Sequence, residues 1–86
     1  MSYRLEFSDT ARKDLSSLPP DLRSRVTRRL GALAKDPLPP GAVPLKGPLR
    51  GLHRVRVGDY RILYQFEPET ATVAIARVAH RSQAYK

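Results

Sequence analysis

Three arginines, Arg54, Arg56 and Arg61, lie close together in the stretch HRVRVGDYRILYQF. Apolar and polar residues alternate on both sides of the dipeptide GD, which predicts two strands joined by a two-residue turn. In that register Arg56 faces Arg61 directly, and Arg54 lies diagonal to Arg61. Like charges in this position destabilise a sheet by a few tenths to about 1 kcal/mol. A bound phosphate would turn the repulsion into a prearranged clamp, because guanidinium groups bind phosphate oxygens through parallel hydrogen bonds.

The same alternation sorts the side chains of this hairpin onto two faces. One face is apolar and is expected to lie under helices: Val55, Val57, Tyr60, Ile62, Tyr64 and Phe66. The other face carries the three arginines together with Leu52 and Leu63. The alternative interpretation is a solvated face, on which long side chains splay apart and salt screens their repulsion.

The C-terminal segment RVAHRSQAY places His80, Arg81 and Tyr85 just past the last predicted strand. A histidine can accept a proton near neutral pH, so His80 is a candidate for proton transfer. The alternatives are a surface or capping role for His80 and an apolar anchoring role for Tyr85.

The elements that must position these residues follow from periodicity and from proline. Alternation over Tyr3–Phe7 predicts a short strand. A first amphipathic helix, capped by Ser8 or Asp9, ends at a pair of prolines. A second helix spans about Asp21–Lys35 and is stopped by Pro37.

The segment DPLPPGAVPLKGPLRG is rich in proline and predicts an irregular crossover. Strands follow at about Leu52–Val57, Tyr60–Glu67 and Thr72–Ala79, with PETA as the second hairpin turn. The 86 residues therefore predict one domain, 1–86, of the α+β class. Its order is β-α-α-β-β-β, an antiparallel sheet with a two-helix hairpin packed on one face.

Composition indicates a polyanionic partner. Sixteen Lys+Arg against eight Asp+Glu give a formal charge of +8, and only four of the sixteen are lysines. Arginine suits planar, bidentate phosphate recognition, so nucleic acid is the favoured partner, with the ribosome or an acidic protein as alternatives. Four arginines lie on the second helix away from its apolar stripe: Arg23, Arg25, Arg28 and Arg29. They form either a second RNA-anchoring surface or a solvated helix face.

Several classes of protein are disfavoured. There is no cysteine, which excludes disulfides and thiolate zinc sites. Two histidines without an acidic cluster make a poor ligand set, so no metal and no cofactor are expected. No apolar run is long enough to span a membrane, and the N-terminal residues lack the apolar segment of a secretion signal. A cytoplasmic protein is the default expectation.

Three segments, LPPDLRSRVTRRLGALAKDP, LHRVRVGDYRILYQF and VAIARVAHRSQAY, together resemble the RelE branch of the RelE/ParE toxin superfamily over nearly the whole chain. The resemblance implies a toxin of a type II toxin–antitoxin system, an mRNA interferase that cleaves mRNA in the ribosomal A site and inhibits translation. It implies a metal-independent endoribonuclease, in which the RNA 2′-OH attacks the adjacent phosphate and leaves a cyclic phosphate and a 5′-OH. The implied partners are a cognate antitoxin, the ribosome and mRNA.

Carried over by position, the family's site falls on two basic residues before the turn, one arginine after it and a pair in the tail: Arg54 and Arg56, Arg61, and Arg81 and Tyr85. With this carry-over, Arg56, Arg61 and Arg81 are expected to bind the scissile phosphate, and Arg54 is expected to help position the RNA. Lysines are common at the first pair in that family. Arginine stays protonated, so proton transfer is left to His80 or Tyr85.

Two other functions fit the same fold. A ParE-type inhibitor of DNA gyrase shares GDYRILY but usually lacks the tail arginine and tyrosine and has a longer helical hairpin. A catalytically inactive binding module would use the basic surface only to dock an acidic partner.

Overall fold

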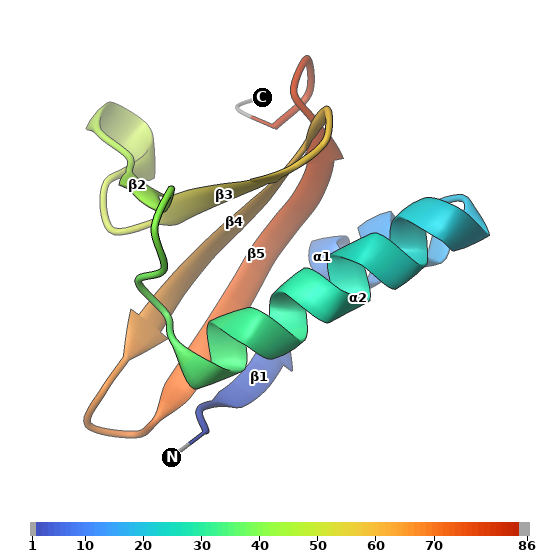
Figure 1. Ribbon diagram of the computed structural model, residues 1–86. Coiled ribbons are helices and arrows are strands. Elements are labelled where there is room, and N and C mark those ends of the chain that lie inside the picture. The colour runs from blue at the N-terminus through green and yellow to red at the C-terminus, as the bar shows by residue number, and fades with distance from the viewer. Residues whose placement is uncertain (1, 85–86) are drawn as a thin grey trace.

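The computed structural model describes residues 2–84, which form one five-stranded sheet and two helices (Figure 1). The elements in chain order are β1 (Arg4–Phe7), α1 (Asp9–Ser16), α2 (Pro20–Lys35), β2 (Val43–Pro44), a 3₁₀ turn (Gly47–Leu49), β3 (His53–Val57), β4 (Tyr60–Glu67) and β5 (Thr72–His80). The strand order across the sheet is β1-β5-β4-β3-β2. The predicted α+β fold is confirmed, with two corrections to its sheet.

The first correction is that the proline-rich crossover contains a short strand. In β2, Val43 pairs with Arg54 and Pro44 pairs with His53. Extended prolines are compatible with this arrangement because β2 is an edge strand, whose outward N–H is not needed in the ladder. The prediction of an irregular crossover was therefore too strict.

The second correction is that the sheet is mixed, because β1 pairs in parallel with β5. The other three strand pairs are antiparallel, and two of them, β3–β4 and β4–β5, were predicted. Alternation along a strand does not encode the direction of a neighbour distant in sequence, so this pairing could not be read from the periodicity.

α1 covers the part of β5 that β1 leaves unpaired. The Ser8 hydroxyl accepts from the Ala11 N–H at 3.0 Å, capping α1, and donates to the Ala76 carbonyl at 2.8 Å. The Asp14 carboxylate accepts from the Val78 N–H at 2.9 Å. These bonds occupy backbone groups that a bare strand edge would leave open.

The core lies between the helices and one face of the sheet. α2 contributes Val26, Leu30 and Leu33, all buried, and contacts β1 and β3. The six apolar hairpin residues predicted for this face lie on it: Val55, Val57, Ile62 and Tyr64 are buried in the core, and Tyr60 and Phe66 pack against it. In residues 2–84 no helix is long and apolar enough to cross a bilayer.

The predicted register of the β3–β4 hairpin is confirmed. Val57 pairs with Tyr60 across the Gly58-Asp59 turn, and Arg56 pairs with Arg61. Gly58 has φ +59°, the left-handed conformation that a tight hairpin turn requires at its first central residue and that glycine adopts without strain.

Tyr64 connects this sheet to the start of the crossover. Its ring is fully buried, and its hydroxyl donates to the Pro37 carbonyl at 2.6 Å. Burial raises the pKa of Tyr64 to about 12, since the charged phenolate is disfavoured away from water. The bond holds the end of α2 against β4.

Replacing Tyr64 by Phe tests this bond. Removing the hydroxyl leaves the Pro37 carbonyl unpaired beside a buried ring, so we expect unfolding free energy to fall by about 1–3 kcal/mol. Urea denaturation at neutral pH measures the loss, and an unchanged midpoint and slope would contradict it.

The same substitution has a signature in alkali. The phenol has a pKa of about 12 in the folded protein against 10.0 ordinarily, so its contribution to stability is complete below pH 10.0 and is lost as pH rises towards 12. We expect the stability difference between the natural chain and Tyr64→Phe to shrink over that interval. A difference that stays constant there would show that the phenol is not protected by burial.

Candidate functional site

Arg56 and Arg61 face each other on the side of the sheet opposite the helices. Arg56 is exposed, but only 8% of Arg61 is exposed. Arg54 lies on the same face, opposite the buried Leu63. The three arginines that the alternation grouped therefore do share one face, near the turn end of the hairpin.

Arg61 is buried without a carboxylate partner. Its Nη1 donates a long bond of 3.4 Å to the Tyr60 carbonyl, and its buried Nε has no hydrogen-bond partner. The arginine–carboxylate ion pairs among residues 2–84 are Arg4–Glu6 and Arg77–Asp14, and neither involves Arg61. A buried charge of this kind costs several kcal/mol unless an opposite charge compensates it. The arrangement is suited to an external anion.

The start of the C-terminal tail lies beside the same end of the sheet. The Arg81 N–H donates to the Asp59 carbonyl at 2.8 Å, which ties the tail to the β3–β4 turn (Figure 1). Ala84 is only 2% exposed, so the tail folds back against the protein. Arg81 is thus brought near the turn that carries Arg56 and Arg61, and Tyr85 lies outside the described residues.

His80 lies on the other face of the sheet. It is the last residue of β5 and pairs with Tyr60, whose ring packs on the helix-bearing side. The two rings meet edge to face with their centroids 5.5 Å apart. The His80 Nδ1 accepts the Ser82 N–H at 3.2 Å, so in the neutral ring Nε2 carries the proton. The structure does not bring His80 to the arginines.

Three of the α2 arginines line a groove with Arg56. Arg25, Arg28 and Arg29 form one side of this shallow groove of about 450 Å³, and the outer edge of β3 forms the other. That edge is open because β2 pairs only with its first two residues. A Cβ atom at Gly58 would lie 3.2 Å from the Arg25 Nη2, which shows that the guanidinium of Arg25 lies against the turn. Among the described residues 2–84, none that lines the groove is acidic.

Arg23 is separated from the other three. Its guanidinium donates to carbonyls at the C-terminal end of α1 and just past it: Leu15 at 3.2 Å, Ser16 at 3.2 Å and Leu18 at 3.0 Å. A cation here satisfies carbonyls that the helix leaves open and complements the helix dipole. The prediction grouped Arg23 with a binding surface because helical spacing alone does not show what a side chain reaches.

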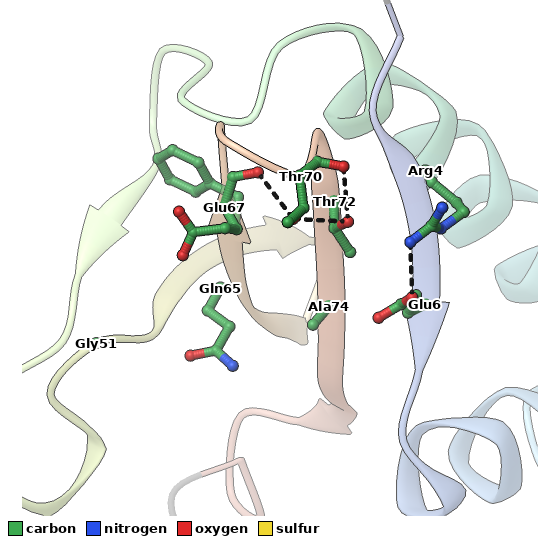
Figure 2. Close-up of a pocket in the computed structure, with 9 residues that line it drawn as sticks. Arg4, Glu6, Gly51, Gln65, Glu67, Thr70, Thr72 and Ala74 are labelled. Atoms are coloured by element: carbon green, nitrogen blue, oxygen red, sulfur yellow. Dashed lines mark hydrogen bonds and ion pairs between the residues drawn. The ribbon is translucent and has the colours of Figure 1, made fainter.

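A polar hollow on the same sheet face as the arginines was missed by the sequence reasoning (Figure 2). It has a volume of about 450 Å³, and Gln65 and Glu67 of β4 line it with Glu6 of β1 and Ala74 of β5. The sequence did contain a signal for this hollow, because Gln65 follows Arg61 and Leu63 at a spacing of two residues and so lies on the same strand face. Within residues 2–84, no three histidine or acidic side chains gather as a metal site would need.

Replacing Arg61 by Met tests whether this guanidinium is an uncompensated charge. Met retains the apolar stem and removes the charge, so we expect the unfolding free energy to rise by about 1 kcal/mol in phosphate-free buffer. Urea denaturation measures it, with Arg12→Met, at an exposed arginine on α1 away from the pair, as the control that changes little. A loss of more than about 1 kcal/mol would show that the charge is already compensated.

Replacing Arg23 by Ala tests its structural role. The loss of the charged donor to α1 should lower unfolding free energy by about 1 kcal/mol, whereas Arg28→Ala on the same helix should change it by less than about 0.5 kcal/mol. Equal effects in the two variants would contradict the assignment.

Comparisons with known proteins agree over the whole chain. Residues 5–85 match the family described as the ParE toxin of type II toxin–antitoxin system, parDE. Toxin RelG of Mycobacterium tuberculosis is 41% identical over 87 residues, which cover 100% of this chain and 99% of the relative. Toxin RelE of the same organism is 34% identical over 85 residues, covering 98% of this chain and 87% of the relative.

Solved structures show the same fold. The crystal structure of the toxin–antitoxin complex RelBE2 from M. tuberculosis matches with a TM-score of 0.83 and 40% identity, covering 94% of this chain and 100% of that one. The archaeal RelE–RelB complex from Pyrococcus horikoshii matches with a TM-score of 0.81 and 29% identity, covering 98% of this chain and 100% of that one. The resemblance seen in three sequence segments is confirmed, and the chain belongs to the RelE/ParE family of type II toxin–antitoxin toxins.

Proposed function

We propose that this toxin is a ribosome-dependent endoribonuclease that cleaves mRNA in the cytoplasm and so stops translation. The observation that carries the proposal is the buried Arg61, which no described carboxylate neutralises and which faces a second arginine. An RNA phosphodiester supplies the missing negative charge. The two guanidiniums are already held together by the sheet, so little reorganisation is needed when charge develops on the phosphate.

The chemistry is a transfer at phosphorus. The 2′-oxygen forms a new bond to the adjacent phosphorus, the bond to the 5′-oxygen breaks, and the products are a cyclic 2′,3′-phosphate and a 5′-OH. Arg56, Arg61 and Arg81 hold the non-bridging oxygens, and Arg54 positions the chain. One proton leaves the 2′-OH and one joins the 5′-oxygen. Arginine cannot accept the first, and this step falls by sequence position to Tyr85 acting as the phenolate, since His80 lies on the other face; the second comes from the phenol so formed or from solvent water.

The α2 groove serves as a second anchor for RNA. Arg25, Arg28 and Arg29 lie around an opening whose described lining holds no acidic residue, and Arg56 belongs both to this groove and to the cross-strand pair. The ribosome offers ribosomal RNA phosphates that can occupy this groove while mRNA occupies the sheet face. Binding of this kind weakens steeply as salt rises, because it releases counterions.

A cognate antitoxin is the proposed protein partner. Two of the similar solved structures, from M. tuberculosis and P. horikoshii, are toxin–antitoxin complexes. An antitoxin segment that covers the basic surface would block the RNA site.

Gyrase poisoning is the second candidate, because the matched family is described by its ParE member. The curated relatives named RelG and RelE favour the ribonuclease. Measuring gyrase-dependent DNA breaks beside ribosome-dependent mRNA cleavage separates the two activities.

Single substitutions test the proposed site on purified ribosomes programmed with mRNA. Arg61→Ala should slow cleavage at least about a hundredfold, because it removes preorganised charge stabilisation. His80→Ala should slow it far less than the roughly hundredfold loss expected when a general base is removed. Rates of appearance of new mRNA 5′ ends measure both.

Arg12→Ala, an exposed arginine on α1, is the matched control for loss of charge. Undiminished cleavage by folded Arg61→Ala protein would defeat the proposal. If His80→Ala lowers the cleavage rate as much as Arg61→Ala does, proton transfer is assigned to His80 and not to Tyr85.

A further inference from the structure

We propose that the polar hollow beside the arginines binds a base of the cleaved RNA and discriminates against uracil. This inference rests on the proposed function, which places an RNA strand on this sheet face. Figure 2 shows the hollow with Gln65 of β4 and Glu6 of β1 on either side of Ala74. It is an opening of about 450 Å³ on the face that carries the cross-strand arginine pair.

The hollow lies on the same face of β4 as Arg61. Every second residue of β4 points to the same face, and this face carries Arg61, Leu63, Gln65 and Glu67. Four residues of strand separate Arg61 from Gln65 by roughly 13 Å. A second opening of about 270 Å³ shares Glu6, Gln65 and Ala74 with the first, so the two form one trough. A nucleotide neighbouring the bound phosphate therefore lies over the trough.

The charge of the trough excludes phosphate and admits a base. Arg4 also lines the trough and is paired with Glu6, so among residues 2–84 Glu67 is the trough carboxylate left to repel the RNA backbone, in contrast to the arginine end of the same face. The small side chain of Ala74 and the absent one of Gly51 leave room for a planar ring. Single-stranded RNA is recognised in this way, by bases that are splayed out and hydrogen-bonded on their edges.

The polar groups of the trough select among the bases. Within residues 2–84, the Gln65 amide and the Glu67 carboxylate make no hydrogen bond, while Glu6 is paired with Arg4 at 3.3 Å. A carboxylate only accepts, so Glu67 favours bases with an exocyclic amino group: adenine, cytosine and guanine. Uracil has no exocyclic amino group, and its single imino donor lies between two carbonyl oxygens that a carboxylate repels, so uracil is disfavoured.

The test is a set of ribosome-bound mRNAs that differ only in one base near the cleaved bond. With the natural toxin, uracil at one fixed position should slow cleavage by about tenfold relative to cytosine. Glu67→Gln should remove most of this difference at that position, because an amide can donate to the uracil carbonyl. Glu69→Gln, in the turn that follows β4 and outside the trough, removes an equal charge and should leave the difference intact.

Failure of the inference is distinguishable from failure of the proposed function. If Arg61→Ala abolishes cleavage while Glu67→Gln and Gln65→Ala keep the natural base profile, the inference is overturned and the function stands. If the natural toxin does not cleave mRNA, the function fails, and NMR of the Gln65 side-chain amide decides the inference. It should shift with single-stranded oligocytidylate and much less with oligouridylate. An amide that neither RNA moves, or that only the antitoxin moves, overturns the inference.

Discussion

The register of the β3–β4 hairpin is the constraint on which the site depends. Val55, Ile62 and Tyr64 are fully buried against the helices, and a slip of one residue would exchange this apolar set with the arginines. The turn at Gly58-Asp59 and the core therefore specify the same pairing. Burial of apolar side chains, worth about 1.5–3 kcal/mol each, easily exceeds the repulsion of about 1 kcal/mol between Arg56 and Arg61. The fold can hold two like charges together because the opposite face of the same strands is a core.

The two faces of the sheet consequently have different tasks. On the helix-bearing face, side chains complete the fold: Tyr64 donates to Pro37, and the His80 ring packs against Tyr60. At the edge of the sheet, the Asp14 carboxylate accepts a hydrogen bond from a backbone N–H of β5, and the Arg23 guanidinium donates to a carbonyl just past the end of α1. The opposite face has an arginine end and a carboxylate-lined end, which suits a strand whose phosphates and bases must be held at different places.

Much of this arrangement was predictable from local patterns. Alternation placed Arg54, Arg56 and Arg61 on one face, and proline and glycine marked the ends of the helices and the turn. The parallel pairing of β1 with β5, the short strand at Val43 and the reach of Arg23 were not predictable, because each depends on contacts between segments or side-chain reach that periodicity does not encode. His80 shows the same limit. Its nearness to arginines in sequence suggested a shared site, but one residue of strand puts it on the other face.

The proposed function requires that the Arg61 guanidinium binds an RNA phosphate. The direct measurement is an NMR titration of the arginine Nε–Hε groups with a single-stranded RNA that carries one 2′-deoxy position and cannot be cleaved there. We predict that the Arg61 signal shifts at the lowest RNA concentration and by the largest amount, and that the Arg56 signal shifts together with it. The reason is that the Arg61 Nε has no hydrogen-bond partner among the described residues. An Arg61 signal that stays fixed while the α2 arginines saturate would contradict it.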